Sequence, residues 1–237
     1  MGGLLAKVFP FNKRNAMTME PHNFQAPPTV TPAPDDTASK TYLALGDSYT
    51  IGESVDIADR YPVQAVQLLR ASHISCQDPE IIATTGWTTG DLLDALRDKT
   101  AEKPYAVVTL LIGVNNQYQG RSMLEYEDQF ISLLHYAIRM TGNQPSHVIV
   151  LSIPDYSVTP FAQHSNTALI ASQIDAFNKI NVSVSRNLEV HYLDITADSR
   201  KAAEDPSLIA QDGLHFSGKE YAIWAARMEP VMKKILQ

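Results

Sequence analysis

A serine, an aspartate and a histidine in this sequence have the types and spacing that nucleophilic catalysis needs. Ser48 lies in Gly46-Asp47-Ser48-Tyr49-Thr50, directly after the apolar run Tyr42–Leu45. Only two residues separate Asp212 from His215. At this spacing the carboxylate can fold back to accept a hydrogen bond from one imidazole nitrogen, and the other nitrogen is then free to take the proton of a serine hydroxyl. Taken alone, the pentapeptide is equally compatible with an ordinary strand-to-loop turn.

Two further segments could bind the negative charge that forms on an ester oxygen. Gly86, in Thr84–Thr88, follows a second apolar run, and a glycine there offers an unobstructed N–H to a nearby substrate. Asn115 follows a third run, Val107–Ile112, and can direct its amide donor into the same space. Each residue alone is also typical of a turn or a cap. With the N–H of Ser48 they would supply three donors.

The composition argues against several other kinds of site. The single cysteine, Cys76, can form neither an internal disulfide nor a cysteine zinc site. No other histidine or carboxylate has the spacing to complete a metal site with Asp212 and His215. The net charge of −7 includes no basic block, so nothing indicates nucleic acid or an anionic membrane as a partner. We therefore expect a small-molecule substrate and no metal or cofactor.

From Thr41 onward, short apolar runs alternate with longer segments of helical period. The expected strands are Tyr42–Leu45, Glu80–Thr84, Tyr105–Ile112, His147–Ser152 and Glu189–Asp194. The expected helices are Tyr61–Ala71, Gly90–Lys99, a helix from Ser122 to Gly142, Asn166–Asn187 and a last helix after Ser217. Ser122 with Glu125, and Ser217 with Glu220, have the spacing of capping boxes, and Pro230 should kink or interrupt the last helix. Because several strands are apolar at consecutive positions, the pattern predicts an α/β fold, a three-layer α/β/α sandwich with five parallel strands.

In such a sheet the carboxyl ends of the strands lie along one edge, where ligands bind. The loops that leave this edge are Gly46–Gly52, Thr85–Thr89, Gly113–Gly120 and Ile153–Asn166, and they should meet in one crevice. Apolar and aromatic side chains beside the catalytic segments could line it. The candidates are Tyr49, Ile51, Trp87, Tyr118, Tyr156, Val158, Phe161 and Phe216.

Taken in order, Gly46-Asp47-Ser48-Tyr49, Gly86, Gly113-Val114-Asn115 and Asp212-x-x-His215 resemble the sequence blocks of the SGNH, or GDSL-type, hydrolases. The resemblance covers about Thr41 to Leu236. It implies a flavodoxin-like sheet and hydrolysis of esters, with Ser48 as nucleophile, His215 as general base and Asp212 as the orienting acid. It also implies an oxyanion hole made by the Ser48 N–H, the Gly86 N–H and the Asn115 side chain.

Two features limit what the resemblance implies. Asn116 stands where the family usually has Asp, so the support that this Asp gives the loop is not implied for this chain. The Gly-x-Ser-x-Gly elbow of ordinary α/β-hydrolases is absent around Ser48, which argues against that fold.

The expected function is a serine ester hydrolase that works through an acyl-enzyme. Because no long apolar insertion suggests a lid, we expect short-chain or acetyl esters as substrates, including acetylated carbohydrate. One alternative is a lysophospholipase or thioesterase. Another is a non-catalytic protein that binds a ligand in the same crevice, although such a protein has no reason to keep Ser48, Asp212 and His215 together. A phosphate-binding regulator would need a carboxylate cluster that the other strand ends do not provide.

Residues 1–40 are predicted to be a proline-rich flexible tail or leader, and residues 41–237 the hydrolase domain. The stretch from Pro21 to Asp36 is rich in proline and has no periodicity. The amino-terminal apolar patch has no preceding basic region and no small-residue cleavage pattern, so a signal peptide is not supported. A cytoplasmic location is therefore favoured, with export as the alternative. No apolar run approaches the roughly 20 residues of a membrane span, and the sequence does not indicate an oligomeric state.

Overall fold

A computed structural model describes residues 39–237, which hold one five-stranded parallel sheet in the order β2-β1-β3-β4-β5. The strands are β1 (Tyr42–Gly46), β2 (Glu80–Ala83), β3 (Val107–Leu111), β4 (Val148–Leu151) and β5 (His191–Leu193). Every position of β1, β3 and β4 is buried, whereas the edge strands β2 and β5 are partly exposed. The five expected strands are therefore confirmed, each within a residue or two at its ends. The predicted tail lies almost entirely outside the described residues.

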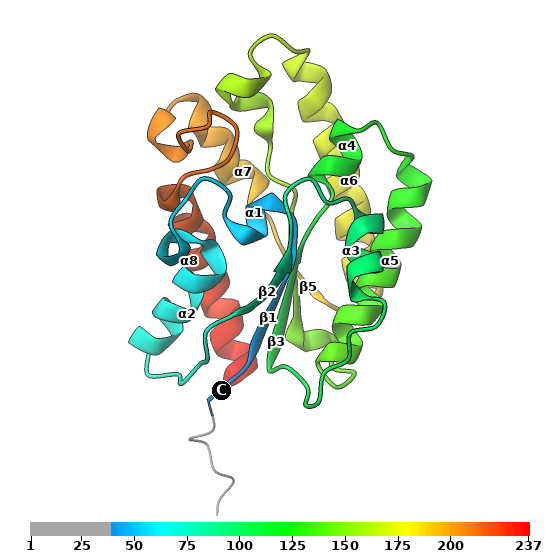
Figure 1. Ribbon diagram of the computed structural model, residues 1–237, viewed down its shortest axis with the longest axis vertical. Helices are drawn as coiled ribbons and strands as arrows, with labels where there is room; N and C mark the ends of the chain where they lie inside the picture. Colours follow the sequence, from blue (N-terminus) through cyan, green and yellow to red (C-terminus); the bar gives the residue numbers. More distant parts are fainter. Residues whose placement is uncertain (1–38) are drawn as a thin grey trace, which may run out of the picture. The chain divides into compact units, whose positions relative to one another are not determined.

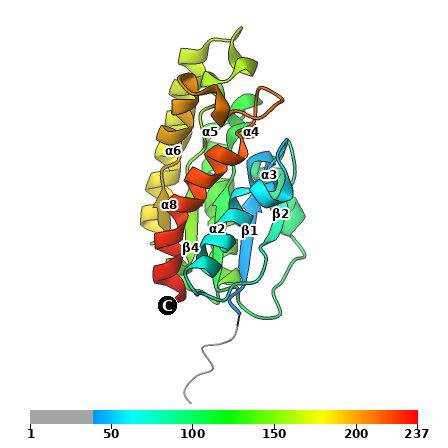
Figure 2. The same cartoon turned by 90° about the vertical axis from the view of Figure 1, so that its left-hand side faces the viewer.

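Helices cover both faces of this sheet (Figures 1 and 2). On one face lie α2 (Tyr61–Ala71) and α8 (Gly218–Leu236), which are seen in front of the sheet in Figure 2. On the other face lie α3 (Thr89–Leu96), α5 (Met123–Met140) and α6 (Thr167–Asn187). The three-layer α/β/α architecture is thus confirmed. No helix in residues 39–237 is long and apolar enough to cross a membrane.

Several short elements that the sequence pattern does not indicate occupy the connections. The α-helical turns are α1 (Ser48–Ile51), α4 (Val114–Tyr118) and α7 (Thr196–Ser199). The 3-10 turns are η1 (Ile57–Asp59), η2 (Pro145–His147), η3 (Tyr156–Val158), η4 (Pro160–Ala162), η5 (Arg200–Ala203) and η6 (Pro206–Leu208). Of these, α1, α4, η3 and η4 leave the carboxyl ends of strands and so lie where a ligand is expected.

Pro230 was expected to kink or interrupt the last helix, and it does not interrupt it. α8 is assigned as continuous from Gly218 to Leu236 with Pro230 inside it. A proline frees the carbonyl four residues earlier, which here belongs to Ala226. Both residues are exposed, so water can bind that carbonyl, while Trp224, Met228 and Met232 hold the opposite face in the core.

The expected capping box at Ser217 forms only in part. The Ser217 hydroxyl lies 3.5 Å from the N–H of Glu220. The Glu220 carboxylate does not reach back to Ser217, because it is buried and accepts a hydrogen bond from Trp224 Nε1 at 2.7 Å. A reciprocal box is found instead at Thr88 and Asp91, where α3 begins.

The register of the sheet brings three of the predicted segments together. Gly46, the last residue of β1, is paired with Ala83 of β2 on one side and Leu111 of β3 on the other. The loops that follow these three residues therefore start side by side. They carry Ser48, Gly86 and Asn115.

Candidate active site

The turn that carries Ser48 depends on a close backbone approach at Gly46. A Cβ at this position would lie 2.1 Å from Thr50 Oγ1 and 2.3 Å from the Leu111 carbonyl oxygen, so only glycine fits. Asp47 then caps α1, because its Oδ1 accepts a hydrogen bond from the N–H of Tyr49 at 3.1 Å. Ser48 is the first residue of α1, and no hydrogen bond in the described part of the chain uses its N–H or its hydroxyl.

Asp47 is fully buried, and its second carboxylate oxygen has no hydrogen-bond partner among the described residues. Burial raises the pKa of Asp47 to about 7, although the hydrogen bond from the Tyr49 N–H acts in the opposite direction. The carboxyl group beside the candidate nucleophile therefore changes charge near neutral pH.

The segment from Asp212 to His215 forms a tight turn that explains their spacing. Asp212 Oδ1 accepts hydrogen bonds from the N–H groups of Leu214 and His215, both at 2.9 Å. Asp212 Oδ2 lies 2.5 Å from His215 Nδ1. The carboxylate thus fixes the ring so that Nδ1 carries the proton and Nε2 is left to act as a base.

This turn is anchored to the chain around it. The His215 carbonyl accepts a hydrogen bond from the Ala210 N–H at 2.8 Å, and Phe216 forms an antiparallel bridge with Ile209. The edge of the Tyr49 ring faces the imidazole, with 5.6 Å between ring centroids. His215 is therefore held from its backbone, from Asp212 and from α1.

Hydrogen bonds keep Asp212 ionised. Burial alone would raise the pKa of Asp212, but hydrogen bonds from Ser54, His215 and two backbone N–H groups outweigh it and hold this pKa well below its usual value. The Ser54 hydroxyl donates to Oδ2 at 2.7 Å. Sequence reasoning did not find Ser54.

Gly86 and Asn115 line the same pocket as Ser48. Gly86 has a φ of +85°, which favours glycine, and a Cβ there would meet no atom within 4 Å, so its backbone faces open space. Its N–H takes part in no hydrogen bond within residues 39–237. Asn115 Nδ2 donates one hydrogen to the Trp87 carbonyl at 2.9 Å, which leaves its second hydrogen for another acceptor.

Asn116, the departure from the family pattern, joins this loop to the start of α3. Its Oδ1 accepts from the Thr89 N–H at 3.0 Å, and its Nδ2 donates to Thr89 Oγ1 at 2.7 Å. The Thr89 hydroxyl in turn donates to Gln129 Oε1 at 2.5 Å. An aspartate could accept from Thr89 but could not donate to it, so the amide suits this relay and supports the loop.

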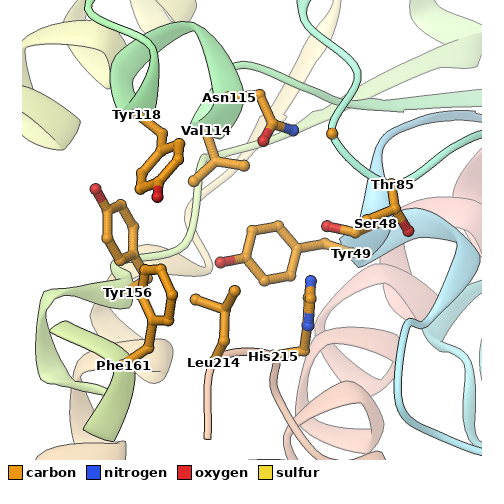
Figure 3. A pocket seen from close by; sticks show the side chains of 11 residues that line it. Ser48, Tyr49, Thr85, Val114, Asn115, Tyr118, Tyr156, Phe161, Leu214 and His215 are labelled. Carbon is orange, nitrogen blue, oxygen red and sulfur yellow. The ribbon is translucent and has the colours of Figure 1, made fainter. Parts of the chain in front are cut away.

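One cavity of about 210 Å³ is lined by the candidate nucleophile, the candidate base and the two candidate donors, Gly86 and Asn115 (Figure 3). Its lining consists of Ser48, Tyr49, Thr85, Gly86, Val114, Asn115, Tyr118, Tyr156, Phe161, Leu214 and His215. Figure 3 shows Ser48, His215 and Asn115 at one end and the rings of Tyr118, Tyr156 and Phe161 at the other. No hydrogen bond joins Ser48 to His215 in the described part of the chain, and such bonds often tighten only when substrate binds.

The structure brings most of the sequence candidates into this lining, but two of the aromatic candidates need correction. Phe216 is fully buried and packs against Tyr49 and Trp224, with centroids 5.8 and 5.6 Å away. Trp87 packs against the hydrophobic core and meets the site through its carbonyl group. Ile51 and Val158 are also absent from the lining.

Sequence reasoning missed three lining residues, Thr85, Val114 and Leu214. Each is adjacent in sequence to a predicted site residue, which is the signal that could have found them. No group of three or more His, Cys, Asp or Glu side chains in the described residues is placed to hold a metal ion.

A comparison with protein families finds a match over most of the chain. A model described as the GDSL-like Lipase/Acylhydrolase family matches residues 44–223, which include every candidate catalytic and oxyanion-hole residue. A search of curated proteins finds no match.

Solved structures with a similar fold are distant in sequence. TesA has 17% identity and a TM-score of 0.64, covering 83% of this chain and 99% of its own. Axe2, an acetylxylan esterase from Geobacillus stearothermophilus, has 17% identity and a TM-score of 0.62, covering 81% and 94%. The psychrotrophic esterase EstA from Pseudoalteromonas sp., solved with monoethylphosphonate as inhibitor, has 17% identity and a TM-score of 0.61, covering 84% and 99%. At this level of sequence identity, the similarity to these structures shows a shared fold and nothing further.

Proposed function

Because the chain belongs to the GDSL-like lipase/acylhydrolase family, we propose that it is a hydrolase that cleaves carboxylic esters through an acyl-serine intermediate. One observation carries the proposal. Ser48 and an Asp212-oriented His215 share the wall of one cavity with two donors, Gly86 and Asn115.

The reaction begins when His215 Nε2 takes the proton of the Ser48 hydroxyl. Ser48 Oγ attacks the ester carbonyl, and the imidazolium then gives its proton to the departing alcohol oxygen. A water molecule, activated by the same nitrogen, attacks the acyl-serine and releases the carboxylic acid. Asp212, held ionised by its hydrogen bonds, stabilises the imidazolium that forms in each half-reaction.

The negative oxygen of the tetrahedral intermediate requires donors that are in place beforehand. The N–H groups of Ser48 and Gly86 have no other hydrogen bond in the described residues, and Asn115 keeps one amide hydrogen available. The tether from Asn115 to the Trp87 carbonyl fixes the amide beside Gly86. Donors that need not reorganise stabilise charge most effectively.

The arrangement of these groups around Ser48 supports one orientation of the ester. In Figure 3 Asn115 and His215 flank Ser48 on opposite sides, and the cavity extends from Ser48 over the Tyr49 ring toward Tyr118 and Phe161. The carbonyl oxygen then points toward Asn115 and the leaving oxygen toward His215. The remaining direction, along the cavity, takes the acyl group.

The cavity volume sets how much of that acyl group the cavity can enclose. A cavity of about 150 Å³ binds benzene, so by proportion 210 Å³ holds an acyl group of roughly eight carbon atoms. The proposed substrates are therefore esters of short acyl chains, including acetyl esters and acetylated carbohydrate. A lysophospholipase or thioesterase role is the second candidate, because the exposed rings of Tyr118 and Phe161 could support a chain that extends beyond the cavity.

The test combines active-site labelling with an acyl-length series. The full chain is treated with a fluorophosphonate probe, the adduct is located by peptide mass spectrometry, and kcat/KM is measured for p-nitrophenyl esters from acetyl to palmitoyl. We expect the label on Ser48 and the highest kcat/KM at or below about eight acyl carbons.

Ser48→Ala is the matched control. It should lose labelling and lower kcat by about 10⁴-fold or more, with an unchanged Tm, since the hydroxyl makes no hydrogen bond in the described part of the chain. Retained turnover in Ser48→Ala would remove Ser48 from the mechanism. Absence of labelling in folded wild-type protein would favour the non-catalytic binding protein, and a steady rise to palmitoyl would favour the long-chain role.

A further inference from the structure

The turn that follows α1 contains a residue in an unfavourable backbone conformation. Ser54 has a φ of +64°, in the left-handed region that side chains other than glycine rarely adopt. Ser54 does not line the cavity of the candidate active site. Its hydroxyl nevertheless reaches Asp212 Oδ2, a partner 158 positions away in the sequence, at 2.7 Å.

Ser54 and His215 share one oxygen of the carboxylate. Asp212 Oδ2 receives Ser54 Oγ–H and lies 2.5 Å from His215 Nδ1, while Oδ1 receives two backbone N–H groups. We propose that Ser54 is a positioning residue of the catalytic site, whose hydroxyl fixes the Asp212 carboxylate against His215. The inference rests on the proposed function only in that it takes His215 as the general base.

The backbone conformation supports this role. Glycine would adopt this φ without strain, yet glycine has no hydroxyl, and strained residues that persist often serve a functional site. The other non-glycine residues with positive φ in residues 39–237 are His73, Asn143 and Glu189, which follow the carboxyl ends of α2, α5 and α6. Ser54 alone among these four follows the nucleophile helix and bonds a candidate catalytic side chain.

A second contact in the same turn connects it to the candidate oxyanion hole. Glu53, next to Ser54, accepts a hydrogen bond from the Thr85 hydroxyl at 2.5 Å, and its N–H donates to the Ser48 carbonyl at 2.9 Å. Thr85 is adjacent to Gly86. Glu53 and Ser54 together therefore link α1 to the Gly86 loop and to Asp212.

The Ser54 hydroxyl should also change the strength of the electrostatic attraction between Asp212 and His215. A donor to Asp212 disperses part of the negative charge of the carboxylate, so its removal should strengthen the attraction between Asp212 and protonated His215. The acid limb of the kcat/KM profile should then move to higher pH. Other titratable groups near this contact are Glu53, Asp56 and Asp59 on the same segment, Tyr49 on α1 and Tyr221 on α8, and all five are unchanged in the variants below.

The experiment compares Ser54→Ala with Ser54→Gly in the full chain. Both variants lack the hydroxyl, but only glycine relieves the backbone strain. We expect both to lower kcat by about three- to tenfold, the size of one hydrogen bond, with KM unchanged. The acid limb should rise by roughly half a pH unit in both, and only Ser54→Gly should keep or raise the wild-type Tm.

The control is Glu189→Gly, which relieves the same strain at an exposed position that lines no part of the candidate site. It should leave kcat and the acid limb unchanged. A Ser54→Gly variant with wild-type kcat and pH profile would overturn the proposal, and so would an effect confined to Ser54→Ala.

A readout without turnover separates this proposal from the proposed function. The pH at which the ring resonances of His215 shift is measured by NMR in wild type and in Ser54→Gly, with His215→Gln used for assignment. We expect this midpoint to move to higher pH even if no ester proves to be a substrate. Equal midpoints would exclude an effect of Ser54 on the Asp212–His215 pair, whereas failure to label Ser48 would count only against the hydrolase function.

Discussion

The two ends of the cavity are built in different ways. At the catalytic end, Ser48 and His215 are only 5% and 7% exposed. Hydrogen bonds fix the groups around them, such as the one from His215 Nδ1 to Asp212. At the aromatic end, Tyr118 and Phe161 are 60% and 48% exposed, and their rings contact each other at 6.1 Å between centroids. Hydrogen bonds impose direction, whereas ring contacts at the surface tolerate movement. The difference indicates that the candidate catalytic groups are held more firmly than the aromatic side chains that the proposed acyl group would contact.

The elements that support each end explain this contrast. Ser48, Gly86 and Asn115 follow three strands that pair in register, of which β1 and β3 are buried at every position and β2 is partly exposed. Phe161 lies in η4, within a long connection between β4 and α6. Tyr156 is held more firmly than Phe161. The residue before it, Asp155, forms an ion pair with Arg200 at 2.8 Å, which keeps this part of the loop in place.

The largest effect in this comparison is expected at the catalytic end. Asn115→Ala removes the amide donor and the tether to the Trp87 carbonyl. We expect kcat to fall by about 10²- to 10³-fold, the usual cost of one oxyanion donor, with KM nearly unchanged. Steady-state kinetics on the best p-nitrophenyl ester measures both constants.

A change confined to KM would instead assign Asn115 to substrate binding and would weaken the claim that this end performs the chemistry. The tether can be examined separately. If losing it displaces the Gly86 loop, the Tm should also fall, and a normal Tm with a low kcat identifies the missing donor as the cause.

The fold was predictable because each layer leaves a local signal in the sequence. The buried strands are continuous apolar runs, and helices such as Tyr61–Ala71 repeat apolar residues on one face. The interruption expected at Pro230 does not occur, because the cost of a proline in a helix depends on whether water reaches the freed carbonyl. Whether that carbonyl is exposed depends on the tertiary structure and cannot be read from the periodicity of the sequence.

The candidate site was predictable only in part, for similar reasons. Asp212 and His215 meet through a turn of four residues, so their spacing reveals the contact. Ser54 and Asp212 are 158 positions apart and meet only in the tertiary structure, and a lone serine in a loop gives no signal of that contact. Phe216 was misplaced because its position next to His215 does not show which way its ring points, and the ring is fully buried against Tyr49 and Trp224 while His215 lines the cavity.

Asp47 allows a test of how far water is excluded from the catalytic end. Its pKa is raised by burial from 3.8 to about 7, so between these values the folded protein holds a proton that the unfolded chain releases. The folded state therefore loses stability as the pH rises through this window, by about 1.4 kcal/mol per pH unit from this group. Asp47→Asn cannot ionise but can still accept from the Tyr49 N–H.

We expect the free energy of unfolding of Asp47→Asn, relative to wild type, to increase by about 2 kcal/mol between pH 5 and pH 7. Urea unfolding at several pH values measures this difference. Asp98→Asn, which removes an exposed carboxylate, should follow the wild-type curve. If Asp47→Asn also runs parallel to wild type, Asp47 is already ionised at pH 5 and the catalytic end is better solvated than its burial indicates.

The smallest effect is expected at the aromatic end, and it concerns selectivity. Phe161→Ala removes a half-exposed ring from the far wall of the cavity. The ring contributes mainly apolar contact with the acyl group, and a few buried methylenes are worth on the order of 1 kcal/mol here. We expect kcat/KM to fall about fivefold for octanoyl esters and hardly at all for acetyl esters, which do not reach the ring.

Leu124→Ala is the matched control, because Leu124 is an exposed apolar residue that does not line the cavity. It should leave the acetyl-to-octanoyl ratio unchanged. An equal loss on both esters in Phe161→Ala would mean that the ring supports the fold of the loop, and the two ends would then not be separable. An increase for octanoyl esters would mean that Phe161 closes the cavity, so that its removal lets longer chains enter.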